Sequence, residues 1–269
     1  MTSRREFLAS TLALGAMTGL SPASSVQTPG LPSLKGRKVL FTYGGWDGHE
    51  PEKFSAFIST WLKGEGAEVL LHSTLEPYAD KSLMDTVDLV VQIFTMATIT
   101  KEQEAGLLEA VEKKGTGMAG WHGGMCDAFR QNEAYRYMTG GLWVAHPGGY
   151  VDYEVNITDH KDAVTQGLHD FAMKSEQYYM HVDPNVKVLA TTRFNGQTNA
   201  WIDGCVMPVT WKKMHGKGRI FYTSVGHNLS HIIDKPDAME MLKRGIRWAG
   251  ASKYEPAEKW VNPVYARLK

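Results

Sequence analysis

Short apolar runs alternate with segments of helical periodicity through the first half of the chain. Lys38–Tyr43 is a mostly apolar run, as is typical of a strand buried on both faces of a sheet. After it, apolar residues recur at the spacing of one helix face, between a proline suited to a first turn and a terminal glycine; these are Pro51, Phe54, Phe57, Ile58, Trp61, Leu62 and Gly64. The pattern predicts a strand followed by an amphipathic helix.

The same alternation continues to residue 121. Glu68–His72, Val87–Phe94 and Thr116–Trp121 have the composition of three further strands. Thr100–Gln103 has the form of a capping box, and the helical periodicity after it stops at Gly115. This β-α-β-β-α-β order predicts an α/β fold in which helices cover both faces of an open, mostly parallel sheet.

Beyond Gly140 the pattern changes to strands separated by polar turns that contain glycine. A helix is predicted near the end of the chain, over Pro236–Trp248. The predicted strands are Tyr150–Ile157, Lys187–Thr192, Met207–Lys213 and Arg219–Ser224. We expect these to form later strands and an antiparallel C-terminal extension of the same domain.

Composition limits the class of partner. The chain has 269 residues, enough for one substantial core, and we expect one domain over residues 38–269. Lys+Arg and Asp+Glu both number 29, and the mature part has no basic block. Electrostatics therefore give no reason to expect nucleic acid or an anionic membrane surface as partner, and a small neutral ligand fits better. The oligomeric state stays open, a homo-oligomer included.

The N-terminus resembles an export signal of the bacterial twin-arginine (Tat) type. Arg4 and Arg5 precede the apolar, small-residue stretch Leu8–Leu20, which is too short to span a bilayer permanently. Ser21–Ala23 offers small residues for cleavage. We expect a signal peptide over residues 1–23, a linker over 24–37 and a periplasmic mature protein; the alternative is a leader retained in the cytoplasm. The protein has two cysteines, Cys126 and Cys205, which can pair in an oxidising compartment but form no disulfide framework.

Histidines follow three of the predicted strands. In open α/β sheets, ligands bind at the carboxyl ends of the strands. The loops there are Gly44–Glu50, Thr95–Ala97, Trp121–Gly124 and Val225–Asn228. Three of these loops bring His49, His122 and His227 to one face, each with glycine nearby to permit close approach of a ligand.

Several motifs together resemble the trehalose utilisation (ThuA-like) family. They span Lys38–Ala249 and are GWHGG at 120–124, HPGG at 146–149, SEQYYM at 175–180, PVTW at 208–211 and GKGRIFYTSVGH at 216–227. The resemblance implies a fold similar to class I glutamine amidotransferases. It also implies a role in the use of trehalose and related disaccharides, through 3-keto-glycoside intermediates.

Glutamine hydrolysis does not fit the strand-to-helix turn. Amidotransferases of this class need a cysteine there, because a thiolate attacks the amide carbonyl. This chain has His122 at the turn, and Cys126 lies four residues further on. His122 can instead act as a general acid or base, or as a metal ligand.

A metal site requires partners for His122 from distant loops. The candidates are His49, His146, His181, His227 and Glu176. Zinc or another divalent ion held by histidines and a carboxylate, with one position open, would polarise a keto-sugar carbonyl or activate water. His227 and His231 have helical spacing but lack the glutamate of H-E-x-x-H, so this pair is a weak signal.

Other residues suit contacts with a sugar. Trp46, Trp121 and Tyr179 can stack on a pyranose ring, although each can equally belong to the core. Asp47 and Asp127 can accept sugar hydroxyls or cap helices, and His146 can bind substrate or only shape a turn.

We therefore expect an exported enzyme that acts on a disaccharide, a glycoside or its 3-keto derivative. His122 would be the central acid/base or a metal ligand, with His49, His227 and Glu176 around it, and the reaction would proceed with or without a divalent metal. The chemistry would be that of a hydrolase, lyase or isomerase. The alternative is a non-catalytic carbohydrate-binding protein with the same pocket. A dinucleotide-dependent reductase fits less well, because Gly44–Gly48 lacks the G-x-G-x-x-G spacing.

Overall fold

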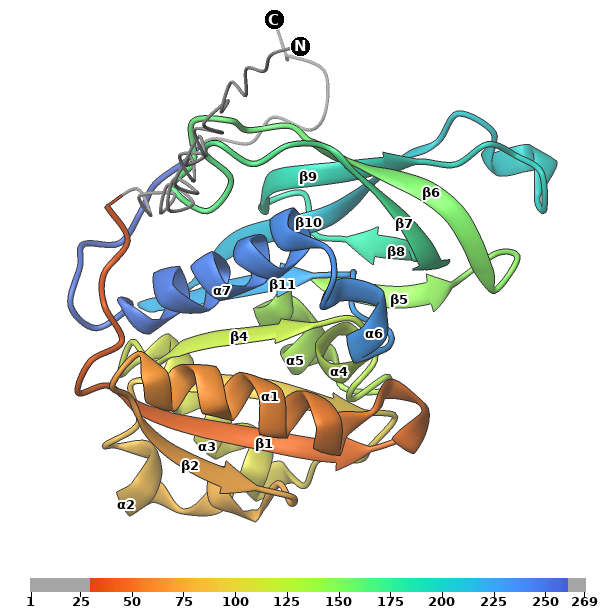
Figure 1. The fold of residues 1–269 in the computed structure, drawn as a ribbon. Coiled ribbons are helices and arrows are strands. Elements are labelled where there is room, and N and C mark those ends of the chain that lie inside the picture. Colours follow the sequence, from red (N-terminus) through yellow and green to blue (C-terminus); the bar gives the residue numbers. More distant parts are fainter. Residues whose placement is uncertain (1–29, 261–269) are drawn as a thin grey trace, which may run out of the picture.

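The computed structural model describes residues 30–260, which fold around one nine-stranded sheet (Figure 1). The strand order across the sheet is β2-β1-β3-β4-β11-β10-β9-β6-β7. A separate two-stranded sheet pairs β5 (Gly141–Ala145) with β8 (Tyr179–Val182). The predicted signal peptide, residues 1–23, lies outside the described residues.

The first five strands of this order run parallel to one another. They are β2 (Glu68–His72), β1 (Lys38–Gly45), β3 (Leu89–Thr95), β4 (Gly117–Trp121) and β11 (Gly218–Thr223). Their carboxyl ends all lie at one edge of the sheet, near α4 (Gly123–Cys126) and α6 (Leu229–Ile232), on the right in Figure 1. This edge carries the loops in which the histidines were predicted.

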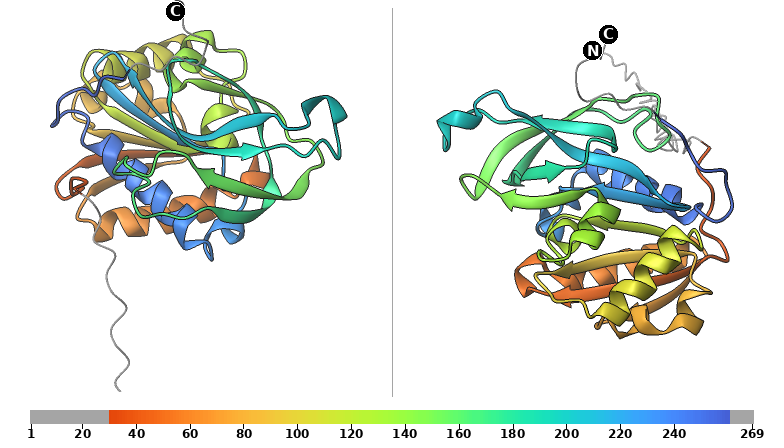
Figure 2. Two further views of the ribbon diagram at one scale, coloured as in Figure 1. Left: turned by 90° about the horizontal axis from the view of Figure 1, so that it is seen from above. Right: turned by 180° about the vertical axis from the view of Figure 1, so that it is seen from behind.

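The remaining strands are antiparallel to their neighbours and form the extension. They are β10 (Val206–His215), β9 (Lys187–Arg193), β6 (Tyr150–Ile157) and β7 (Phe171–Glu176). β9 and β10 are joined by residues 194–205, which include the short 3-10 helix η3 (Ala200–Ile202). This connection, called the hairpin arm below, projects beyond the sheet (Figures 1 and 2).

Helices cover both faces of the parallel half because its strands are apolar on both faces. Phe41 belongs to a core with α1 (Pro51–Gly64) and α7 (Pro236–Gly250), whereas its neighbour Leu40 belongs to the core on the opposite face. That second core includes residues of α3 (Lys101–Glu112) and α5 (Glu133–Thr139), which lie in front in the right-hand view of Figure 2. Shorter helices are α2 (Lys81–Met84), η1 (Asp47–His49) and η2 (Glu76–Ala79).

The predicted fold class, an open α/β sheet with an antiparallel extension, is confirmed. β11 joins the parallel half rather than the extension. Three strands, β5, β7 and β8, were not predicted, and part of the predicted linker belongs to the core. Leu34, predicted as linker, is fully buried in the core with α1 and α7, so the residues before β1 pack onto the domain.

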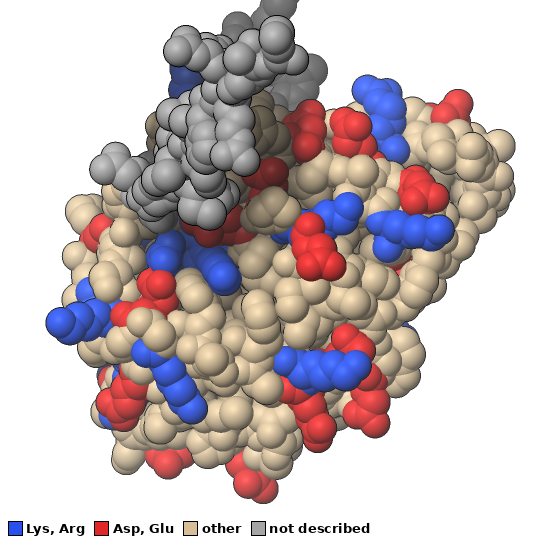
Figure 3. Space-filling model, viewed as in Figure 1, with Lys and Arg blue, Asp and Glu red and all other residues tan. Residues whose placement is uncertain are grey.

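The cysteines are unpaired, and the surface carries charges of both signs (Figure 3). Cys126 and Cys205 are both free thiols. Positive and negative side chains are interspersed on the face shown in Figure 3. Among residues 30–260, no helix has both the length and the apolar character needed to cross a membrane.

One buried ion pair ties the extension to the loop after β6. Lys212 of β10 is 2% exposed, and its Nζ lies 2.9 Å from Asp162 Oδ2. Lys187 Nζ approaches the same oxygen at 2.6 Å. Burial alone would raise the pKa of Asp162, but the two lysines outweigh it and hold this pKa below its usual value of 3.8.

Removing one member of this group is expected to destabilise the fold. Asp162→Asn leaves Lys212 buried with Glu258, 3.2 Å away, as its remaining ion-pair partner, and loss of the charged hydrogen bonds to Asp162 typically costs about 1–3 kcal/mol of the free energy of unfolding. Urea denaturation at pH 7 measures the effect. The exposed Lys174→Met serves as the control and should change the free energy by less than about 0.5 kcal/mol.

Asp162→Asn also tests how the stability of the fold depends on pH. Because the folded pKa of Asp162 is depressed, its contribution to stability is present above pH 3.8 and is lost as the pH falls through the lower folded value. Between about pH 4 and pH 2, Asp162→Asn should therefore lose less stability than the unmodified protein. An identical slope in both proteins would contradict the assignment.

Candidate functional site

Four buried side chains meet at the carboxyl edge of the sheet. His49 lies in η1 after β1, His122 directly follows β4, and His227 follows β11. Glu176 is the last residue of β7, so it reaches the same point from the antiparallel extension. One nitrogen or carboxylate oxygen from each residue lies within 4.8 Å of those of the other three. We call these four residues the tetrad.

The backbone around the tetrad is unusual. His122 has φ 48° and ψ −143°, in the strained strand-to-helix position that a nucleophile elbow also uses. Among the described residues, the other non-glycine residues with positive φ are Glu50 and Met96, which flank the tetrad loops. Such conformations cost on the order of 1–3 kcal/mol each and persist only where packing enforces them. The strain is therefore concentrated at this edge.

Close packing around Gly123 explains why a glycine follows His122 in the GWHGG motif. A Cβ at Gly123 would lie 2.3 Å from His49 Cε1 and 2.7 Å from its Nδ1. Real Cβ atoms do not approach other atoms so closely, so a side chain here would displace the His49 ring. Glycine at this position lets two strand ends bring their histidines into contact.

Hydrogen bonds fix the orientation of two rings. His122 Nδ1 lies 2.7 Å from the carbonyl oxygen of Ser224, so this nitrogen carries the proton that is donated. The other nitrogen, Nε2, lies 3.1 Å from Glu176 Oε2 and 3.2 Å from His227 Nδ1. His49 Nδ1 lies 2.8 Å from Thr95 Oγ1.

The pKa shifts favour neutral His49 and His122 rings beside a charged Glu176 carboxylate. Burial, assisted by His122 and His227, lowers the pKa of His49 to about 2. Burial likewise lowers the pKa of His122, against the opposing effect of Glu176. For Glu176, burial would raise the pKa, but the adjacent His122 and His227 outweigh burial and hold it below its usual range.

When the His122 ring is neutral, its contact with Glu176 lacks a hydrogen-bond donor. With its proton on Nδ1, a neutral His122 presents a lone pair at Nε2 to the lone pairs of Glu176 Oε2, at 3.1 Å. His227 Nδ1 lies 3.2 Å from His122 Nε2 and 3.1 Å from Glu176 Oε2 and can donate only one proton to them, whereas a divalent cation would satisfy both sets of lone pairs. Zinc bound at about 2.0–2.2 Å by histidine nitrogens and a carboxylate oxygen suits this set of ligands. The residues able to hold such an ion are His49, His122, Glu176 and His227.

Aromatic and polar groups surround the tetrad. Trp46 is 46% exposed, and its ring centroid lies 4.8 Å from that of His49. Tyr150 is 51% exposed, and its ring centroid lies 5.0 Å from that of His227. His146 Nε2 is 3.7 Å from Glu176 Oε1, the carboxylate oxygen that does not face His122. Two exposed aromatic rings and one partly exposed histidine therefore lie at the tetrad.

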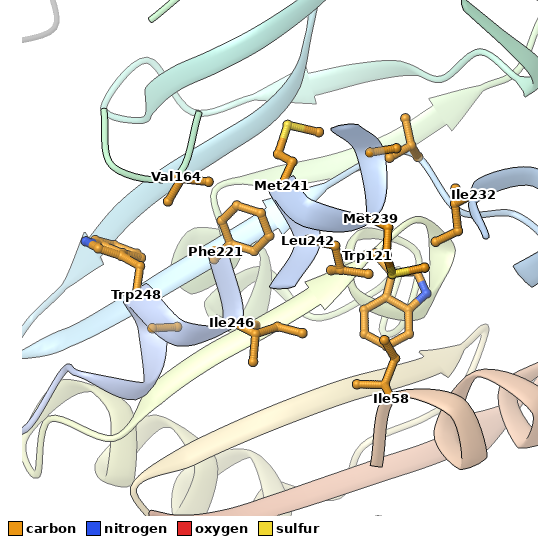
Figure 4. Close-up of a cluster of buried hydrophobic side chains, with 14 of the residues drawn as sticks. Ile58, Trp121, Val164, Phe221, Ile232, Met239, Met241, Leu242, Ile246 and Trp248 are labelled. Atoms are coloured by element: carbon orange, nitrogen blue, oxygen red, sulfur yellow. The ribbon is translucent and has the colours of Figure 1, made fainter. Parts of the chain in front are cut away.

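Several predicted contact residues lie elsewhere. Trp121 does not fit the predicted sugar-stacking role, because it is fully buried beside Ile58 of α1 and Met239 of α7 (Figure 4). Asp127 is buried and its carboxylate accepts hydrogen bonds from Arg130. Tyr179 packs near Phe194 rather than against the tetrad.

Two further predicted residues are exposed. Asp47 begins η1 beside the tetrad, with its side chain exposed. His181, one of the predicted metal-ligand candidates, lies on β8 and lines a separate hollow with Arg136 and Leu142.

Other neighbours of the tetrad were not predicted. Tyr178 stacks on His122 with ring centroids 4.0 Å apart, whereas Tyr179 was the tyrosine predicted to lie at the site. Thr95 was placed in a loop but is the last residue of β3, directed at His49. His231 contacts Ser175 Oγ at 2.9 Å and stacks near His227. The alternation of Phe171, Met173 and Ser175 carried the signal for β7 and hence for Ser175.

Comparison with solved structures places this fold among ThuA-like proteins. A ThuA-like protein from Bacteroides uniformis aligns with a TM-score of 0.67 at 17% identity, covering 82% of this chain and 94% of its own. One from Parabacteroides merdae aligns with a TM-score of 0.65 at 20% identity, covering 84% and 94%. A glutamine amidotransferase from Thermotoga maritima aligns at 11% identity and a TM-score of 0.46, covering 81% and 93%.

Comparison of the sequence with curated proteins gave no match. The family model described as trehalose utilisation (ThuA) matches residues 38–249, which include the four residues of the tetrad and every strand found within residues 30–260. The chain therefore belongs to the ThuA, or trehalose utilisation, family.

Proposed function

We propose that the tetrad binds a divalent metal ion, zinc before others, and that the protein transfers a proton on a disaccharide, a glycoside or its 3-keto derivative. The observation that carries this proposal is the convergence of three histidines and one carboxylate within 4.8 Å. Membership of the ThuA family gives the chain a carbohydrate-related role.

The surroundings of the tetrad suit a sugar. Trp46 and Tyr150 present exposed aromatic surface beside His49 and His227, and such surface packs against the apolar face of a pyranose ring. A bound metal would supply polarisation of a carbonyl or hydroxyl oxygen of the substrate. The three histidines and the Glu176 carboxylate would hold it.

Proton transfer is then assigned to His146. When His122 acts as a ligand through Nε2, that atom is not free to serve as a base. His146 Nε2 lies 3.7 Å from Glu176 Oε1, and the side chain is 37% exposed, so it can meet both the tetrad and a substrate. Glu176 thus has one oxygen for the ligand set and one that orients the proton-transfer group.

Metal binding is tested with single variants. His122→Ala removes a ligand and should abolish stoichiometric zinc binding, measured by titration against a chromophoric chelator. Thr95→Val removes only the hydrogen bond to His49 and should weaken zinc binding by about 10–100-fold. The exposed His169→Ala controls for the loss of a histidine and should bind as the unmodified protein. Unchanged affinity in His122→Ala would refute the metal site.

Activity is tested on zinc-loaded protein with a panel of disaccharides and their 3-keto forms. We expect turnover of at least one compound, and a loss of about 10²–10⁴-fold in kcat for His146→Gln with zinc content unchanged. Saturable binding with every sugar recovered unaltered would instead identify a carbohydrate-binding protein without catalysis.

We also propose export to the periplasm, based on Arg4, Arg5 and the apolar stretch Leu8–Leu20. Fractionation of bacterial cells should recover the mature protein in the periplasm. Replacement of both arginines by lysine should leave the precursor in the cytoplasm, and periplasmic recovery of that variant would exclude a Tat signal.

A further inference from the structure

A polar groove is lined in part by Pro147 and Gln177, the residues that follow His146 and Glu176 in the chain. Its volume is about 440 Å³, within the range of roughly 300–1,000 Å³ that is typical of small-molecule sites. Its walls come from the loop after β5, the start of β6, the residue after β7 and the hairpin arm. Five of the eleven lining residues carry amides or hydroxyls, and these are Gln177, Asn195, Gln197, Thr198 and Asn199.

The wall of the groove formed by Pro147 and Gln177 adjoins the tetrad through neighbouring residues of the chain. Gln177, which lines the groove, directly follows Glu176 of the tetrad. Pro147, on the opposite strand connection, directly follows His146, whose Nε2 approaches Glu176 at 3.7 Å. A ligand that spans this wall would therefore contact both places at once.

The HPGG motif builds part of this wall. Gly148 has φ +88°, and a Cβ there would lie 2.8 Å from both Thr198 Oγ1 and Val151 Cγ1. The absence of a side chain lets the turn at 146–149 pack against the hairpin arm. The motif thus brings His146 and the arm together.

Hydrogen bonds hold the floor of the groove in place. The Gln177 amide nitrogen donates to Thr192 Oγ1 at 2.8 Å and to the carbonyl oxygen of Arg193 at 3.2 Å. Gln177 is buried, so its orientation is set by β9 before any ligand arrives. Such preorganisation reduces the entropy lost on binding.

The lining residues select for a neutral, hydroxylated ligand. Amide side chains donate and accept hydrogen bonds, which suits hydroxyl groups that do both. In the described part of the chain, the groove has no Lys or Arg in its lining, and Asp152 would repel an anion. Phe194 and Ile202 supply apolar surface for the C–H face of a ring.

We propose that this groove binds the second ring of a disaccharide or glycoside whose reacting ring lies at the tetrad. The inference rests on the proposed function, because the tetrad must bind a sugar for its neighbour to bind the next one. It names the substrate class as a sugar with at least two rings, or one ring with a polyhydroxylated substituent.

The test compares trehalose with methyl α-glucoside, its one-ring counterpart, by calorimetric titration of zinc-loaded protein. We expect trehalose to bind more tightly than the glucoside. The double variant Asn195→Ala/Gln197→Ala should weaken trehalose binding by about tenfold or more and leave glucoside binding within twofold. Asn185→Ala, an exposed amide at the turn between β8 and β9, is the matched control and should alter neither.

The outcomes separate the two proposals. Equal affinities for both sugars, with no effect of the double variant, would overturn the groove assignment and leave the proposed function intact. Binding of zinc without binding of either sugar would overturn both. Zinc content and the thermal unfolding midpoint of each variant show whether the double replacement has disturbed the tetrad or the fold.

Discussion

The contact of Glu176 with His122 and His227 is the interaction on which this architecture depends. The three histidines come from the parallel half of the sheet, after β1, β4 and β11, and the carboxylate comes from β7 at the far edge of the antiparallel half. Glu176 Oε2 lies 3.1 Å from both His122 Nε2 and His227 Nδ1. Burial of these groups is tolerable only when the negative charge and the lone pairs have a partner.

Packing around the tetrad is arranged to hold these groups in position. The carbonyl of Ser224 fixes His122 from one side and the ring of Tyr178 covers it from another. Thr95 orients His49, and Gly123 leaves room for its ring. These supports come from strand ends or from residues adjoining them, which are more rigid than free loops and keep ligand geometry precise.

The parallel half was predictable because periodicity and strand polarity are local properties. Once strands were placed before His49, His122 and His227, the rule that parallel strands end at one edge brought the three together. Tyr178 and Thr95 could not be assigned so directly, since their roles depend on where β8 folds back and where β3 ends. Trp121 was misjudged because a strand-end residue becomes core when α1 and α7 both cover it.

Sequence changes in the turns that carry the histidines and sequence changes in the hairpin arm have different consequences. On our assignments, the reactive groups depend mainly on three turns that tolerate little alteration, as the space around Gly123 shows. The second sugar ring would meet the hairpin arm, residues 194–205, which connects β9 and β10. Under these assignments, insertions and replacements in the arm would change ligand preference while the histidines keep their places.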